Sequence, residues 1–356
     1  MQRRPPLSRR TFLKLTATMA AGAAMASCST TQTPPNPTDT PTEVNPTVPP
    51  DPTVGRTLED TTQTEINPTQ GNQVDATTAP QPSPTSSPAY LAVVHGPDPA
   101  AITRAAVETL GGIAAFVSPG YDVIVKPNIC TDYHPPEYAS TTNPTVIATL
   151  VAMCLEAGAK RVRVMDYPFG GTPQSAYQIS GIAEAVEAAG GEMHIMTRPK
   201  YIQVDIPLGK DLKKVEIYPD ILEADLLINV PIAKHHSSTR LTLGEKNLMG
   251  TILDRNQMHI NLTQRIADLT SLVRPGLTVI DAVRILTKHG PTGGSLDDVR
   301  QTDTVIASRD IVAADAYATT LFGLTSADIG YIRASAELGL GTTDLTSIDL
   351  REVSIA

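Results

Sequence analysis

The sequence contains no tryptophan, four phenylalanines and three cysteines, and each scarcity disfavours a class of function. Only Cys130 and Cys154 follow residue 89, without a Cys-x-x-Cys spacing, so this chain alone cannot hold an iron–sulfur cluster on four thiolates. Few aromatic rings argue against surfaces that stack on bases or sugars. The formal net charge of −9 also argues against nucleic acid as a partner, because phosphate binding needs a basic face.

Sequence spacing alone does not decide whether Cys130 and Cys154 form a disulfide. Cys154 lies on an apolar stripe with Ile147 and Leu150 at helical spacing, which favours a buried free thiol.

The N-terminal residues carry a targeting motif, Ser8-Arg9-Arg10-Thr11-Phe12-Leu13-Lys14. Two arginines before Phe-Leu-Lys are typical of a twin-arginine export signal. The uncharged run at 15–26 is too short to span a bilayer and suits the apolar part of a cleaved signal. We therefore expect the twin-arginine translocase to export this protein already folded.

A cysteine follows the apolar run at the place where a lipoprotein signal needs it. Met25-Ala26-Ser27-Cys28 resembles a lipobox, which predicts lipid on Cys28 and an anchor on the extracytoplasmic face of the membrane. Cleavage before Ser27 would instead give a secreted or periplasmic protein. Residues 1–28 are thus the signal, and the Pro/Thr-rich residues 29–88 are expected to be a disordered linker.

Residues 89–356 alternate between strand and helix patterns, which predicts an α/β domain with a mostly parallel, doubly wound sheet. Asn143 and Asp310 are the expected N-caps of two helices. The stretch 192–218 is rich in strands and is expected to be a small insertion. Strands are expected at 90–94, 123–125, 162–165, 192–197, 203–206, 213–217, 225–230, 277–280 and 304–307, and helices at 99–110, 144–158, 174–189, 261–273, 311–321 and 327–338. Strand order and oligomeric state do not follow from the pattern.

Polar residues follow the expected strands at the ends where ligands bind in open parallel sheets. Lys126, Asn128, Asp166, Asn229, Lys234, His236 and Asp281 all come after such strands, and Asp315 lies inside the helix after the last of them. The sequence therefore predicts a site at this edge of the sheet.

An ordered set of motifs across residues 89–356 is similar to the bacterial and archaeal family catalogued as domain of unknown function 362. The matching segments are Lys126-Pro127-Asn128, Thr142-Asn143-Pro144, Glu156-Ala157-Gly158-Ala159, Asn229 with Pro231, Lys234 and His236, Lys246-Asn247-Leu248-Met249-Gly250, His259, Gly290-Pro291-Thr292-Gly293 and Ala313-Ala314-Asp315. The resemblance implies redox association, because many members carry an attached ferredoxin-like segment with cysteine clusters. No such segment occurs in this sequence, which disfavours electron transfer here.

The chemistry of these residues favours a site for a small anion. Lys126, Lys234 and Lys246 would hold the anion with Asn128, Asn229, Asn247 and Asp315 as further substrate-binding residues. His236 and His259 would act as ligands of a divalent metal or as acid and base, and Asp166 or Asp281 would orient them. The alternatives are histidines that bind loop carbonyls and ordinary solvated lysines.

Three functions fit these features. The first is an exported enzyme that acts on a small anionic substrate, with an unknown cofactor for which a divalent metal is one candidate. The second is a tethered solute-binding protein without turnover, and the third is an accessory protein that docks on a redox partner.

Overall fold

The computed structural model describes residues 90–356. The export signal, the lipidation at Cys28 and the linker lie outside these residues and stay predictions. Among the described residues, no helix has the length and apolar character needed to cross a membrane.

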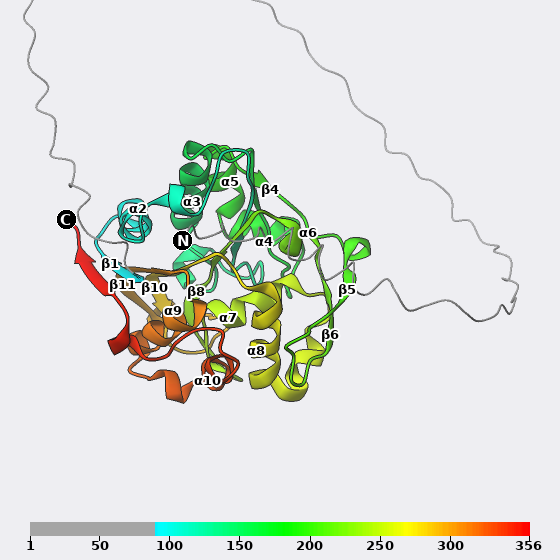
Figure 1. Cartoon of the computed structure of the whole chain (residues 1–356). Coiled ribbons are helices and arrows are strands. Elements are labelled where there is room, and N and C mark those ends of the chain that lie inside the picture. The colour runs from blue at the N-terminus through cyan, green and yellow to red at the C-terminus, as the bar shows by residue number, and fades with distance from the viewer. Residues whose placement is uncertain (1–89) are drawn as a thin grey trace, which may run out of the picture. The chain divides into compact units, whose positions relative to one another are not determined.

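The described residues form one large sheet with helices on both faces (Figure 1). Its strand order is β12-β1-β11-β10-β7-β2-β3-β4, with β8 and β9 joined to β10. The strands are β1 (Leu91–His95), β2 (Asp122–Pro127), β3 (Arg161–Val164), β4 (Glu192–Met193), β7 (Leu226–Val230), β8 (Ile232–His236), β9 (Arg240–Thr242), β10 (Leu277–Leu286), β11 (Val299–Ser308) and β12 (Leu350–Ser354).

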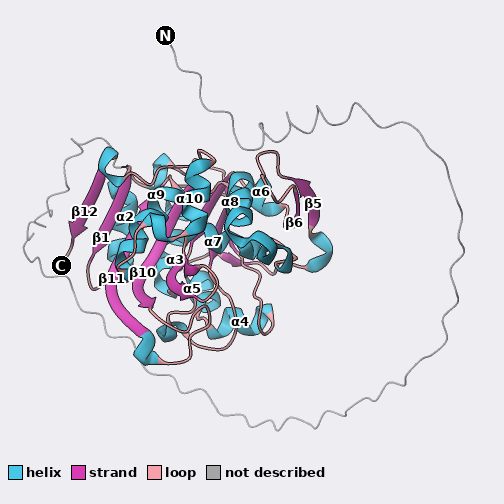
Figure 2. Cartoon of the chain, turned by 90° about the horizontal axis from the view of Figure 1, so that it is seen from below, coloured by secondary structure: helices cyan, strands magenta, loops and turns pink. Residues whose placement is uncertain are grey.

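Most pairings in this sheet are parallel, which confirms the predicted fold class. The run β4-β3-β2-β7-β10 is parallel throughout, as are the pairs β8–β10 and β1–β12. Antiparallel pairing occurs where β11 joins β10 and β1, and between β8 and β9. Figure 2 shows β12, β1, β11 and β10 side by side at one end of the sheet.

Helices between the strands cover the two faces as the alternating pattern predicts. One face carries α2 (Pro99–Thr109), α3 (Pro144–Glu156), α4 (Pro173–Ile179) and α5 (Ile182–Ala188), and the other carries α7 (Gly244–Asn247), α8 (Leu262–Val273), α9 (Ile311–Ala318) and α10 (Gly330–Glu337) (Figure 1). A further short helix, α6 (Asp220–Glu223), precedes β7. The predicted N-caps are confirmed, since Asn143 and Asp310 accept hydrogen bonds from the first turns of α3 and α9.

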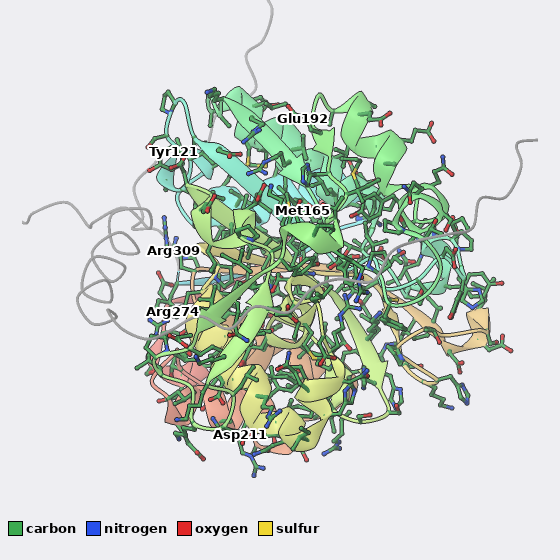
Figure 3. The ribbon with its side chains drawn as sticks, turned by 90° about the vertical axis from the view of Figure 1, so that its right-hand side faces the viewer. Tyr121, Met165, Glu192, Asp211, Arg274 and Arg309 are labelled. Carbon is green, nitrogen blue, oxygen red and sulfur yellow. The ribbon has the colours of Figure 1, made fainter. Side chains whose placement is uncertain are left out.

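Alternation along each strand sends side chains to two separate cores. In β2, Val123 and Val125 pack against the α2–α5 face, whereas Ile124 packs against the opposite face. Lys126 follows Ile124 by two residues and therefore points toward the α7 side of the sheet. Met165, at the end of β3, is fully buried and lies in the middle of the molecule in Figure 3, where Glu192 lies near the rim.

Several predicted boundaries were wrong because local turns and long-range pairing decide them. The helix expected at 174–189 is two helices, since Gly181 between α4 and α5 has a φ of 69° that ends the first one. The strand expected at 192–197 is only β4. Strands β8, β9 and β12 were not expected, and β10 and β11 are longer than predicted because they pair with each other.

The expected insertion is confirmed as a separate two-stranded antiparallel sheet, β5 (Ile202–Asp205) and β6 (Lys214–Ile217). Cys130 and Cys154 are both free and buried, so the predicted buried thiol at Cys154 is confirmed and the two cysteines do not form a disulfide.

Candidate functional site

A cavity lies beyond the carboxyl ends of β2 and β3, between β8 and the segment that begins with α7. This is the edge at which parallel sheets bind ligands. The lining residues come from four parts of the chain: Asn128, Cys130, Asp166, Tyr167, Phe169, Lys234, His236, Thr242, Lys246, Asn247, Met249, Gly250, Arg255 and Pro291.

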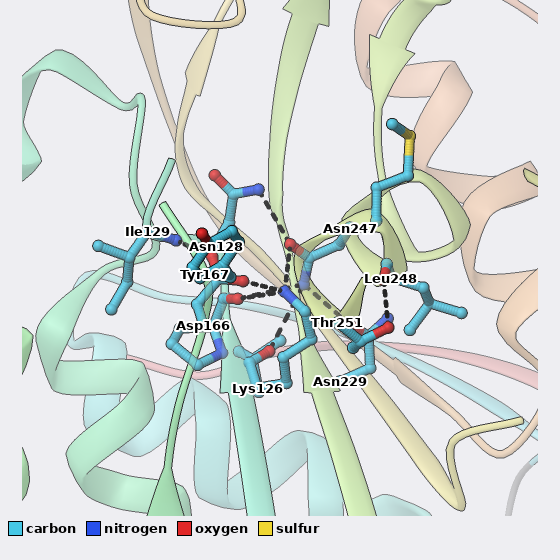
Figure 4. Close-up of polar contacts among 12 residues, drawn as sticks. Lys126, Asn128, Ile129, Asp166, Tyr167, Asn229, Asn247, Leu248 and Thr251 are labelled. Atoms are coloured by element: carbon cyan, nitrogen blue, oxygen red, sulfur yellow. Dashed lines mark hydrogen bonds and ion pairs between the residues drawn. The ribbon is translucent and has the colours of Figure 1, made fainter. Parts of the chain in front are cut away.

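A buried ion pair forms the base of the cavity. The Nζ of Lys126 lies 2.8 Å from Oδ1 of Asp166, and both side chains are almost fully buried (Figure 4). The other carboxylate oxygen, Oδ2, accepts a 2.6 Å hydrogen bond from the backbone N–H of Ile129. Burial lowers the pKa of Lys126, and the neighbouring Asp166 opposes that shift. Each oxygen of the Asp166 carboxylate thus already has a hydrogen-bond donor from the protein.

Gly250 packs directly on this ion pair. A Cβ at this position would collide with Oδ1 of Asp166 and would lie 2.7 Å from Nζ of Lys126. The glycine in the Lys-Asn-x-Met-Gly motif therefore allows the chain after α7 to approach the pair closely.

Asn247 connects the ends of three elements. Its Oδ1 accepts hydrogen bonds from Nζ of Lys126 at 3.2 Å and from Nδ2 of Asn128 at 2.9 Å. Its Nδ2 donates to Oδ1 of Asn229 at 2.9 Å, and Asn229 in turn donates to the carbonyl of Gly244 (Figure 4). These bonds hold α7 against β2 and β7, so the position of α7 is fixed.

Lys234 is held by three acceptors at the side of the cavity. Its Nζ donates to the carbonyl of Ser140 at 2.6 Å, to Oδ1 of Asn128 at 2.9 Å and to Sγ of Cys130 at 3.4 Å. Lys234 is only 1% exposed, and its acceptors are a backbone carbonyl, an amide oxygen and a cysteine sulfur rather than a carboxylate. Its positive charge is therefore solvated by dipoles rather than neutralised.

Lys246 differs from the other two lysines because its amine has no hydrogen bond or ion pair within residues 90–356. The residue is 9% exposed and lines the cavity. Burial lowers the pKa of Lys246 to about 7, and the positive charges of Arg255 and Lys234 add to that shift. At neutral pH a large fraction of this amine is uncharged.

Arg255 adds a further cation to the lining. Its Nε donates to the carbonyl of Met249 at 3.0 Å, and its Nη2 donates to the carbonyl of Tyr167. The guanidinium also lies over the ring of Tyr167, 5.3 Å from the centroid. Backbone carbonyls thus orient Arg255, which forms no ion pair within residues 90–356, although the charge of Asp166 attracts it.

His236 presents a hydrogen-bond donor to the cavity. Its Nδ1 accepts a 3.1 Å hydrogen bond from the backbone N–H of Ser238, so the proton of the neutral ring is on Nε2. Burial, together with the charges of nearby Lys246 and Lys234, lowers the pKa of His236 to about 3. The hydroxyl of Thr242, which also lines the cavity, is buried without a hydrogen-bond partner.

The structure brings together most of the residues that the sequence predicted for the site. Eight of them lie at the cavity or in the hydrogen-bond network beneath it: Lys126, Asn128, Asp166, Asn229, Lys234, His236, Lys246 and Asn247.

Three predicted residues lie elsewhere. His259 is exposed, with Nδ1 3.0 Å from the carbonyl of Arg255, and does not line the cavity. Asp281 accepts hydrogen bonds from the backbone N–H groups of Asn143 and Val283, and burial raises its pKa to about 6. Asp315 accepts hydrogen bonds from the first two N–H groups of α7. The carboxylates of Asp281 and Asp315 thus accept hydrogen bonds from backbone N–H groups and do not line the cavity.

Eight of the fourteen lining residues were not predicted as site residues, and Arg255 and Thr242 are two of them. Arg255 follows the Lys-Asn-x-Met-Gly motif at residues 246–250, and that nearness was the available signal. Thr242 gave no signal, because its place depends on the pairing of β9 with β8. Within residues 90–356, no group of three or more His, Cys, Asp or Glu side chains could hold a metal ion.

The fold and the site define an α/β protein with a polar, cation-lined cavity at the carboxyl edge of a mostly parallel sheet. The chain belongs to the family defined by a domain of unknown function, DUF362, whose model matches residues 123–320.

Two known proteins are similar to this chain. The thylakoid-associated protein sll1697 of Synechocystis is 26% identical over 260 residues, which cover 67% of this chain and 75% of that protein. The lactate racemase apoprotein of Thermoanaerobacterium thermosaccharolyticum has a TM-score of 0.38 and 13% identity over 60% of this chain. The match spans 53% of the racemase chain, and at this TM-score it carries no inference about activity.

Proposed function

We propose that this protein binds a small anionic molecule, a carboxylate or phosphate compound, in the cavity and acts on it as an enzyme. One observation carries the proposal: Lys234, Lys246 and Arg255 line the cavity, while the single lining carboxylate, Asp166, is already paired with Lys126. Buried charges of one sign are costly unless a counter-charge is present. A bound anion would supply that counter-charge.

Uncharged reactive groups beside these cations favour turnover over binding alone. His236 is a neutral donor, and Lys246 is divided between its charged and uncharged forms near pH 7. Groups with such shifted pKa values are common where proton transfer or nucleophilic attack occurs. His236 belongs to no group of three or more potential metal ligands among the described residues, so we propose no metal-dependent step.

We further propose that the enzyme works on the extracytoplasmic face of the membrane, held there by lipid on Cys28. The twin-arginine motif at residues 8–14 and the lipobox support this placement. Both lie outside the described residues.

Ligand-dependent thermal stability tests the proposal. The full chain would be screened with phosphate, phosphate esters and di- and tricarboxylates at fixed ionic strength, and the midpoint of unfolding would be recorded. A ligand at about 100 times its dissociation constant stabilises the folded state by about 2.7 kcal/mol, which raises the midpoint by several degrees. Candidate anions that stabilise the protein would then be assayed for turnover.

Matched variants separate the cavity from the rest of the surface. Lys246→Met removes a cavity cation, whereas Lys160→Met removes an exposed lysine before the amino end of β3, at the opposite edge of the sheet. The proposal expects the anion effect to be lost only in the first variant. Equal effects in both variants, or no stabilisation by any anion, would contradict it. Stabilisation without turnover would support the solute-binding alternative.

A further inference from the structure

The three lysines at the site divide into two kinds. Lys126 and Lys234 each donate hydrogen bonds to several acceptors, which holds each amine in one orientation. The amine of Lys246 has no such bond within residues 90–356, although the residue is nine-tenths buried and lines the cavity. Its nitrogen lone pair is therefore available to a ligand whenever the amine is uncharged.

The backbone around Lys246 is fixed, so its side chain starts from one position. Asp315 accepts hydrogen bonds from the N–H groups of Gly244 and Glu245, and Asn247 binds Asn229 and Lys126. Lys246 stands between these two anchored positions on a single helical turn. A substrate would therefore meet an amine whose side chain starts from a fixed backbone position inside the cavity rather than a lysine on the open surface.

Other residues that line the same cavity suit a ligand that carries both a carboxylate and a carbonyl. Arg255 and Lys234 supply positive charge for the carboxylate. The Nε2–H of His236 supplies a neutral donor for a carbonyl oxygen. A buried amine beside other cations is the environment in which lysine acts as a nucleophile toward carbonyl compounds.

We propose that Lys246 forms an imine with a small 2-oxo acid bound in the cavity. The inference rests on the proposed function and names its substrate class. In the first step the Nζ–C bond forms and the carbonyl π pair moves to oxygen, which receives one proton from the amine. In the second step the C–O bond breaks and the oxygen leaves as water after taking one proton from solvent. The product is a protonated imine, and no oxidation or reduction occurs.

Each cavity group has a stated part in this reaction. Arg255 binds the carboxylate, and the positive charge of Lys234, whose three donors are already taken, attracts it at longer range. His236 donates to the oxygen on which negative charge develops during attack. The same two cations favour the uncharged amine, because burial and their repulsion lower the pKa of Lys246 to about 7. Bound carboxylate partly offsets that repulsion, and the protonated imine then completes an ion pair with it.

Reductive trapping tests the inference. The full chain would be incubated with pyruvate and sodium borohydride, and the adduct would be located by peptide mass spectrometry. We expect one reduced adduct, on Lys246, with a yield that rises from pH 6 to pH 8 as the amine loses its proton. Lys246→Arg keeps the charge without a usable nucleophile and should reduce trapping at least tenfold, whereas Lys160→Arg should trap as the wild type does.

A second measurement separates failure of this inference from failure of the proposed function. Binding of propionate and phosphate, which have no ketone, would be measured by calorimetry on the wild type and on Lys246→Arg. Anion binding without an adduct would overturn the imine and leave the proposed function in place. No binding and no adduct would overturn both. Adducts spread over exposed lysines would also overturn the imine. Circular dichroism would check that Lys246→Arg is folded, so that a loss of trapping reports the missing amine and not an unfolded chain.

Discussion

Replacement of Asp166 by asparagine tests whether the buried ion pair beneath the cavity holds the site together. Asparagine keeps the shape of the side chain, and its oxygen can still accept the hydrogen bond from Ile129. Its NH2 group cannot accept the bond from Lys126, so the negative charge and that acceptor are both lost. Lys126 is then a fully buried cation with Lys234 and Arg255 nearby and no carboxylate beside it. Removing one partner of a buried pair costs about 3–5 kcal/mol.

The free energy of unfolding, measured by urea denaturation, should fall by this amount. For a domain of this size the thermal midpoint should fall by roughly 10 °C, since 1 kcal/mol corresponds to about 2–4 °C. Lys126→Met should cost less, about 1–3 kcal/mol, because Asp166 keeps its bond from Ile129 and lies near Arg255. The double variant should be more stable than Asp166→Asn alone, because it removes the uncompensated cation.

The reasoning fails if Asp166→Asn costs less than about 1 kcal/mol, the value of an exposed ion pair. It also fails if the two single costs simply add in the double variant. Either result would mean that the lysine is neutral or solvated in the folded protein, and that the cavity does not need the pair.

Three further predictions follow from the site and the targeting motif. Gly250→Ala should lower the free energy of unfolding by about 1–3 kcal/mol and weaken anion binding, because the added methyl group collides with Asp166. Urea denaturation would measure the first effect and calorimetry the second. An unchanged midpoint of urea unfolding would contradict the packing of Gly250 on the ion pair. Anion affinity should fall as pH rises through about 7, because Lys246 loses its positive charge there. The free energy of unfolding should instead rise between pH 7 and about 10, because in this range Lys246 keeps its proton in the unfolded chain but has lost it in the folded protein. Both trends should be absent in Lys246→Met. Changing residues 9–10 to lysine should keep the protein in the cytoplasm, and Cys28→Ala should move it out of the membrane fraction, as cell fractionation would show.

The sequence pattern was sufficient for the parts of the site that depend on strand ends. Lys126 and Lys234 were found because each follows a buried apolar run, and parallel strands end at a common edge. The same reasoning could not separate Asp166, which lines the cavity, from Asp281, whose oxygens bind backbone N–H groups of neighbouring segments. That difference depends on which loops lie over each strand, and contacts between distant segments decide it.

The remaining misses have the same origin. Asp315 was expected to face the cavity. Instead α7 lies over α9, and the Asp315 carboxylate accepts hydrogen bonds from the first two N–H groups of α7. His259 follows the motif segment closely in the sequence, yet the chain turns outward before it and leaves the ring exposed. Thr242 reaches the cavity only because β9 folds back on β8, a pairing that no local pattern indicates.

The parallel pairing of β12 with β1 joins the two extremes of the described chain. Leu91 lies opposite Leu350 and His95 opposite Ser354, so the first strand has a partner on that side only after synthesis has passed residue 354. Until then its outer edge is unpaired, and unpaired edges recruit other chains. A deletion that starts at residue 350 should therefore produce aggregation and poor yield even though it removes nothing from the cavity. A chain that is exported only when folded would wait in the cytoplasm until this last strand is in place.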